Sequence, residues 1–181
     1  MGMCLGIGDQ YPIMSAREEF DSWAAEGRDK GMEDRHWHTA KHVLARMPVE
    51  AGDMVVDLGT GSGYALRALR ETADIGRGYG LDGAPEMARN AAGYTDDDAV
   101  GFLVGDFDAL PLADDTVDHV FSMEAFYYAQ NPVETLRELR RVPAPGSPVH
   151  LAVNHHQDHV PHHNRPQNIR AETNPPHPQT Y

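Results

Sequence analysis

Cysteine and long hydrophobic runs are scarce in this chain of 181 residues. The single cysteine, Cys4, excludes an internal disulfide framework and a cysteine-based zinc site, and it indicates a cytoplasmic setting. No apolar run reaches the length of a membrane span. The first dozen residues also lack the basic start and long apolar stretch of a signal peptide. We therefore expect neither export nor membrane insertion.

Positive charge is scarce as well, because 15 Lys and Arg stand against 28 Asp and Glu, for a net charge of −13. Such a surface repels phosphate, which argues against nucleic acid and anionic membranes as partners. Lys30 and Lys41 are the only lysines. This balance resembles proteins of halophilic microbes, where concentrated salt screens charge repulsion beyond about 3 Å. An ordinary acidic cytosolic protein is the alternative.

The length predicts a single domain, with short segments on either side of it. Met14 followed by Ser15 and Glu18 looks like a start codon and a capping box, so residues 1–14 are interpreted as a disordered leader. From residue 155 the chain is rich in His, Pro, Asn and Gln and has almost no apolar periodicity. We interpret residues 15–154 as the folded domain and residues 155–181 as a low-complexity tail.

The apolar pattern of the domain changes from helical to alternating. Spacings of three and four predict two N-terminal helices that are broken between Gly27 and Gly31, with the second ended by Pro48. Strands are then predicted at 54–58, 78–81, 100–104, 117–122 and 149–153, and helices at 64–72, 85–92 and 132–142. Alternating strands and helices predict an α/β fold, a Rossmann-like parallel sheet with flanking helices and an N-terminal helical cap.

A glycine loop follows the first predicted strand. Gly59, Gly61 and Gly63 run as G-x-G-x-G, whereas a dinucleotide fingerprint needs a third glycine where Tyr64 stands. The loop also lacks the lysine of a triphosphate-binding loop. Glycines without a Cβ allow backbone to turn tightly against a ligand, so the loop predicts a cofactor site of another type.

This loop resembles the first motif of the class I S-adenosylmethionine-dependent methyltransferases, which places an acidic residue, here Asp57, two positions before it. The resemblance implies that Asp82 binds the ribose hydroxyls, that Asp106 and the Phe107 backbone contact the adenine, and that Met87 packs on it. It therefore implies S-adenosylmethionine as cofactor. The residues expected to bind it are Asp57, Gly59, Thr60, Gly61, Gly63, Asp82, Gly83, Met87, Asp106 and Phe107.

Residues 110–118 and 134–142 are similar to the ubiquinone and menaquinone methyltransferase branch, which implies a small organic methyl acceptor. The resemblance covers the first five strands of a seven-stranded core, so the sequence looks C-terminally truncated or altered. A sheet that ends there would expose a parallel edge, which predicts pairing into a homodimer or coverage by the tail.

The residues that face the acceptor are not identified by any motif. No Asn/Asp-Pro-Pro-Tyr/Phe sequence follows the fourth strand, which argues against methylation of bases in nucleic acid. Glu124, Tyr127, His36 and His38 are candidates, although packing or surface roles fit them equally. His38 and His42 have metal-binding spacing but no third ligand, so we expect no metal site.

Each cofactor assignment has a plainer alternative. Asp57 could accept hydrogen bonds from the loop alone, Asp82 and Asp106 could cap turns, and Met87 could simply fill the core. The functional alternatives are a non-catalytic or truncated S-adenosylmethionine-binding domain and, less favoured by the glycine spacing, a nicotinamide-dependent oxidoreductase.

Overall fold

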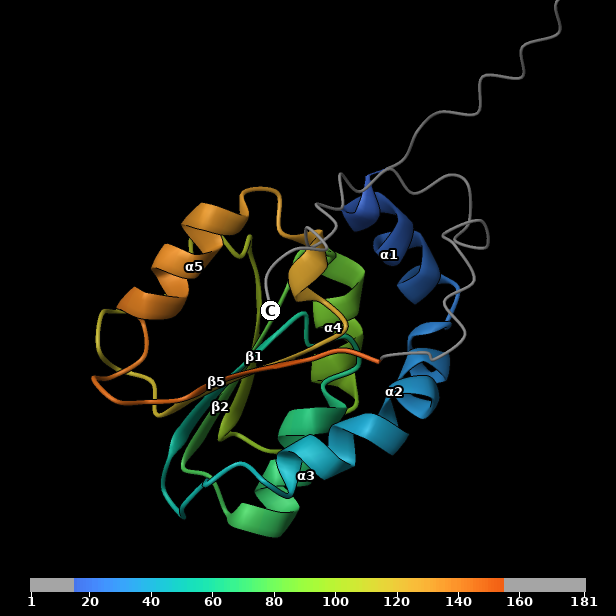
Figure 1. Cartoon of the computed structure of the whole chain (residues 1–181). Coiled ribbons are helices and arrows are strands. Elements are labelled where there is room, and N and C mark those ends of the chain that lie inside the picture. The colour runs from blue at the N-terminus through green and yellow to red at the C-terminus, as the bar shows by residue number, and fades with distance from the viewer. Residues whose placement is uncertain (1–14, 155–181) are drawn as a thin grey trace, which may run out of the picture.

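The computed structural model describes residues 15–154 (Figure 1). The expected leader, 1–14, and the expected tail, 155–181, lie outside the described residues. Within the described range, no helix is long and apolar enough to cross a membrane.

Within residues 15–154, five parallel strands form one sheet in the order β3-β2-β1-β4-β5. They are β1 (Met54–Leu58), β2 (Arg77–Asp82), β3 (Val100–Val104), β4 (His119–Met123) and β5 (Val149–Ala152). Because β1 and β4 lie centrally, their side chains are buried on both faces, and they read as apolar runs. The predicted α/β class and parallel sheet are confirmed.

The helices are α1 (Ala16–Ala25), α2 (Asp29–Leu44), α3 (Tyr64–Ala73), α4 (Pro85–Gly93) and α5 (Pro132–Arg141), with a short 3-10 helix η1 (Phe126–Tyr128). The capping box is confirmed, since Glu18 N–H donates to the Ser15 hydroxyl and Glu18 accepts from Ser15 N–H. The second helix ends at Leu44, before Pro48, and the fourth strand begins at His119 because Val117 pairs separately with Pro143.

The hydrophobic core is divided by the sheet. On one face α2 and α3 bury Ala40, Leu44, Leu66 and Leu69 against β1 and β4. On the other face Leu139 of α5 packs with Val56, Leu58, Val117 and Val120. Figure 1 shows α5 on one side of the sheet and the other helices on the opposite side. The helix α1 packs on α4, around Ala24 and Met87, and so covers the carboxyl end of the sheet.

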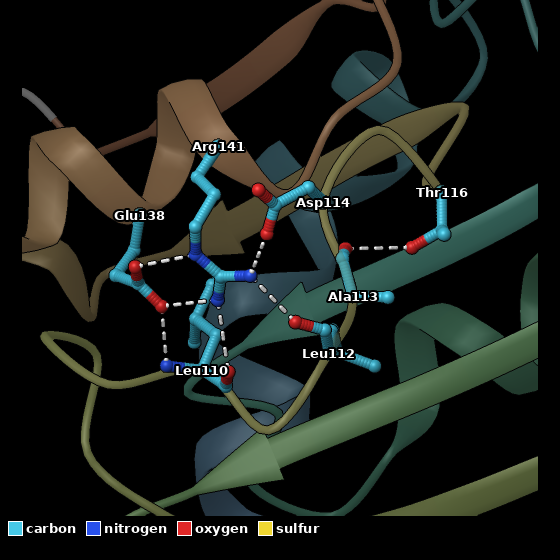
Figure 2. Close-up of polar contacts among 7 residues, drawn as sticks. All are labelled: Leu110, Leu112, Ala113, Asp114, Thr116, Glu138 and Arg141. Atoms are coloured by element: carbon cyan, nitrogen blue, oxygen red, sulfur yellow. Dashed lines mark hydrogen bonds and ion pairs between the residues drawn. The ribbon is translucent and has the colours of Figure 1, made fainter.

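A polar network around Arg141 fastens the long segment between β3 and β4 to α5 (Figure 2). The guanidinium donates to both carboxylate oxygens of Glu138, at 2.7 and 2.6 Å. It also donates to Asp114 Oδ1 and to the carbonyl oxygens of Leu110 and Leu112. Because this segment has no helix of its own, the network fixes the route by which the chain crosses to β4.

Candidate functional site

A cavity of about 480 Å³ opens at the carboxyl ends of β1, β2 and β4. The sheet order changes direction between β1 and β4, and in open α/β sheets ligands bind at that point. Of the residues expected to bind the cofactor, only Gly63 is absent from the cavity wall. The topology therefore brings together acidic residues from the ends of three strands. The sequence pattern predicts the order of these residues along the chain, but it does not predict their positions around the cavity.

The glycine loop from Gly59 to Gly63 turns over the ends of β1 and β2. The backbone N–H groups of Gly59 and Thr60 both donate to the Leu81 carbonyl, at 2.8 and 3.1 Å. All three glycines have positive φ, a conformation that side chains disfavour. A Cβ on Gly59 would lie 2.2 Å from Ala125 Cβ, whereas one on Gly61 would meet nothing within 4 Å.

Gly63 has a packing role instead. It caps the N-terminus of α3, and an added Cβ would lie 2.6 Å from the Phe102 ring. The loop therefore uses its outer glycines for close packing, and it presents the central one, Gly61, to the open cavity.

Asp57, which is buried, and Asp82, which is partly buried, place their carboxyl groups beneath the loop. Asp57 accepts from the Thr60 hydroxyl at 2.9 Å, and Asp82 accepts from the N–H groups of Gly61 and Ala84 at 3.0 and 2.9 Å. Burial raises the pKa of Asp57 to about 7, with the charge of Asp82 adding to the effect. Burial also raises the pKa of Asp82 to about 6, although its backbone hydrogen bonds oppose that shift.

The far end of the cavity is formed by the turn after β3. Asp106 is exposed and forms an ion pair with Arg17 of α1 at 3.5 Å. Phe107 lies beside the loop, 3.4 Å from where a Gly59 Cβ would be. Met87, in the first turn of α4, is buried and also lines the cavity. This end therefore combines apolar surface with an exposed carboxylate, which suits a flat polar ring.

The acceptor candidates separate into two pairs. Glu124 and His36 line the cavity, whereas Tyr127 and His38 do not. Tyr127 lies behind Glu124 and donates its hydroxyl to Glu124 Oε2 at 2.6 Å. His38 lines a shallow outer groove with His42 and His150, and its Nδ1 lies 2.9 Å from the Arg35 carbonyl.

Sequence reasoning missed several cavity residues from the N-terminal half. The Ser62 hydroxyl donates to Glu33 Oε2 at 2.7 Å, and Arg67 pairs with the same carboxylate at 3.0 Å. Tyr64 is also buried in the wall, and burial, followed by the charge of Asp57, raises its pKa above the usual range. These contacts join residues about thirty positions apart, and no local motif signals them.

A family described as a methyltransferase domain matches residues 56–151. A methyltransferase solved in complex with the Haloferax volcanii Trm112 methyltransferase activator is 70% identical, with a TM-score of 0.75, and the match covers 78% of this chain and 63% of that one. An S-adenosylmethionine-dependent methyltransferase from Methanococcus maripaludis, 21% identical with a TM-score of 0.65 over 75% of this chain and 64% of that one, shares the fold.

Among curated relatives, the malonyl-[acyl-carrier protein] O-methyltransferase of Halorhodospira halophila is 37% identical over 141 residues. That match covers 75% of this chain and 46% of the relative. The Marinomonas enzyme of the same name is 34% identical over 107 residues, which are 59% of this chain and 40% of the relative. The chain thus spans less than half the length of these relatives. The methyltransferase domain family indicates S-adenosylmethionine as the cofactor.

Proposed function

The chain belongs to the methyltransferase domain family, and we propose that it transfers a methyl group from S-adenosylmethionine to a small organic acceptor. The observation that carries the proposal is the hydrogen bond between Gly61 N–H and Asp82, which sets a carboxylate beside an open glycine in the cavity. The comparisons do not favour a non-catalytic domain or an oxidoreductase over this activity.

The residues present fit this cofactor. Asp82 keeps lone pairs beyond the backbone hydrogen bonds that it accepts, and a carboxylate can accept from two vicinal hydroxyls. Gly61 leaves the space over the loop open, and Asp106 with Phe107 offers an acceptor and a ring at the adenine end. Asp57, Thr60, Gly83 and Met87 also line the cavity.

The bound cofactor supplies a methyl group that its sulfonium already activates. The task of the protein is then positioning, because transfer needs the acceptor atom in line at about 3 to 3.5 Å from the methyl carbon. Among the lining residues that the expected cofactor contacts leave for the acceptor are Phe20, His36, Glu124 and Tyr128.

Calorimetric titration of the full chain with S-adenosylmethionine, S-adenosylhomocysteine and NAD tests the assignment. We expect binding of the first two and none of NAD. Binding of NAD alone would sink the proposal. Release of S-adenosylhomocysteine in the presence of an acceptor panel then separates an enzyme from a binding domain.

The similarity to the ubiquinone and menaquinone methyltransferase branch is one reason why we propose a small acceptor. The two segments that show this similarity, 110–118 and 134–142, contact each other in the Arg141 network and do not meet at the cavity. Their similarity therefore supports the fold, and it does not identify the acceptor. The malonyl-[acyl-carrier protein] acceptor in the names of two relatives is a second class for the panel.

A protein partner is also part of the proposal. The neighbour at 70% identity was solved with a Trm112 methyltransferase activator, and we infer that this chain takes a partner of the same kind. Co-expression with a Trm112 protein followed by size-exclusion chromatography tests this. A single peak that contains both chains is expected. A peak of twice the chain mass without the activator would instead support the homodimer.

We also infer a cytoplasmic protein from a halophile. Two observations support a halophilic source: the net charge of −13, and the 70% sequence identity to a methyltransferase solved with a Haloferax volcanii activator. The unfolding midpoint should therefore rise between 0.1 and 2 M KCl, because salt screens the surplus acidic groups. A midpoint that is independent of salt would argue for an ordinary acidic protein.

A further inference from the structure

His36 and Glu124 are two ionisable side chains of the cavity that the expected cofactor contacts leave unused. We propose that His36 is the base that takes the proton of the acceptor, and that Glu124 is the positioning residue that holds the resulting imidazolium. The site would then select an acceptor with an O–H or N–H group over a carboxylate. This inference rests on the proposed methyl transfer, whose cofactor binding can be tested separately.

Glu124 is held in one place by an unusual backbone and two donors. Its φ of 56° is positive, a conformation that costs energy for a residue with a side chain and is found most often at functional sites. Tyr127 donates to Oε2 at 2.6 Å, and Asn154 N–H donates to Oε1. With both oxygens engaged, Glu124 is suited to supply a fixed negative charge and poorly suited to take up a proton itself.

The same contacts reach the helix that carries His36. The Thr39 hydroxyl, one turn along α2 from His36, donates to the side-chain oxygen of Asn154. Asn154 therefore joins α2 to Glu124 at the end of β4. Within residues 15–154 the ring of His36 makes no hydrogen bond that would occupy its nitrogens. A ring nitrogen is thus free to accept from a molecule in the cavity.

The surroundings of His36 favour the neutral ring mainly through burial, while the charge of Glu124 favours the protonated ring. Burial lowers the pKa of His36, Glu124 opposes this, and Arg35 and His38 on the same helix add to the lowering. At neutral pH the ring is therefore uncharged and able to act as a base. The protonated ring is then stabilised by the charge of Glu124, which lines the same cavity.

The cavity has little to offer an anionic acceptor. Among the described residues of its wall, Arg17 is the only Lys or Arg, and it is paired with Asp106 at 3.5 Å. Glu33 of the wall is paired with Arg67. A carboxylate beside Glu124 would find no free cation, and it carries no proton for His36 to remove. An alcohol, phenol or amine meets neither obstacle.

The proposed methyl transfer conserves atoms and electrons without any further reactant. A lone pair on the acceptor oxygen or nitrogen forms the new bond to the methyl carbon, and the pair of the broken carbon–sulfur bond stays on sulfur. The acceptor proton passes to the free ring nitrogen of His36 and from there to water.

Histidine NMR on the full chain tests the pair without any acceptor. With His36→Gln to assign the signal, Glu124→Gln should move the His36 titration to lower pH, since the stabilising charge is gone. Glu71→Gln removes an exposed carboxylate of α3 and should leave it unmoved. Identical titrations in the wild type and Glu124→Gln would overturn the inference.

Methylation of phenol, benzylamine and benzoate tests the selectivity. Phenol or benzylamine should be preferred, and His36→Gln should lower kcat about 100-fold while S-adenosylmethionine affinity is kept. His42→Gln, on the outer face of the same helix, should retain wild-type kcat. Preference for benzoate, or full activity of His36→Gln, overturns the inference. If no probe reacts, the NMR titration decides alone, and failure to bind S-adenosylmethionine contradicts the proposed function itself.

Discussion

The carboxylate of Asp82 accepts a hydrogen bond from the backbone N–H of Gly61 at 3.0 Å, and this joins the end of β2 to the middle of the glycine loop. The partners are 21 positions apart in the chain, yet both belong to one wall of the cavity. Asp82 also accepts from Ala84 N–H at the start of α4. One carboxylate thus fixes the loop, the strand and the next helix around the proposed cofactor site.

Asp82→Ala should therefore weaken S-adenosylmethionine binding by about 1 to 3 kcal/mol, through lost hydrogen bonds to the ribose and a less ordered loop. Calorimetric titration at pH 7.5 measures it. Asp96→Ala, which removes an exposed carboxylate between α4 and β3, serves as the matched control and should bind as the wild type does. Unchanged affinity in Asp82→Ala would remove Asp82 from the site.

The two loop glycines Gly59 and Gly61 should respond differently to alanine. Gly59→Ala forces a Cβ to 2.2 Å from Ala125, so we expect a loss of about 2 to 4 kcal/mol in the free energy of unfolding. Gly61→Ala has open space and should cost about 1 kcal/mol for its positive φ. Its methyl enters the proposed cofactor space, so binding should suffer more than stability.

Urea unfolding and calorimetric titration separate these two effects. Equal stability losses in the two variants would contradict the packing role of Gly59. Wild-type cofactor affinity in Gly61→Ala would show that the open side of the loop does not face the cofactor.

Most of the fold could be predicted because its signals are local. The parallel strands are short apolar runs, the glycine loop and Pro85 mark helix starts, and Ser15 with Glu18 caps α1. The errors fall where tertiary contacts decide. Val117 pairs with Pro143 outside the strand, and α2 ends at Leu44 without needing Pro48.

The site could be predicted where a residue lies at the end of a strand, and less so elsewhere. Asp57 and Asp82 lie at the carboxyl ends of β1 and β2, Asp106 follows β3, and parallel strands end at the same edge of a sheet. The pairing of Ser62 with Glu33 depends on how α2 packs beside the loop, which no spacing reveals. The sequence likewise could not separate His36, in the cavity, from His38, outside it.

The buried carboxyl of Asp57 should make the apo protein less stable as pH rises. Its folded pKa, about 7, lies above the ordinary 3.8, so the folded state holds the proton more tightly than the unfolded state between these values. The proton is therefore stabilising at low pH, and that stabilisation, on the order of 4 kcal/mol, is lost between about pH 4 and 7.

Asp57→Asn has no proton to lose, so its free energy of unfolding relative to the wild type should rise from pH 4.5 to about pH 7 and level off above that. Urea unfolding at several pH values measures the difference. Asp96→Asn, at an exposed position, should show a constant difference over the same range. A constant difference for Asp57→Asn would mean that the carboxyl is not desolvated.

The Arg141 network should be the main support of the segment that leads into β4 (Figure 2). Arg141→Ala leaves Glu138, which is half-buried and also accepts from Leu110 N–H at 2.7 Å, without its cation. Because the guanidinium is partly exposed, we expect a loss of about 2 to 3 kcal/mol rather than the larger loss of a fully buried pair. Arg140→Ala, on the exposed face of α5, should change stability by less than about 0.5 kcal/mol.

The Arg141 network lies away from the cavity, so both variants should keep the S-adenosylmethionine affinity of the wild type when it is measured below the unfolding transition. Loss of affinity in Arg141→Ala would show that this segment positions β4 and Glu124 as well.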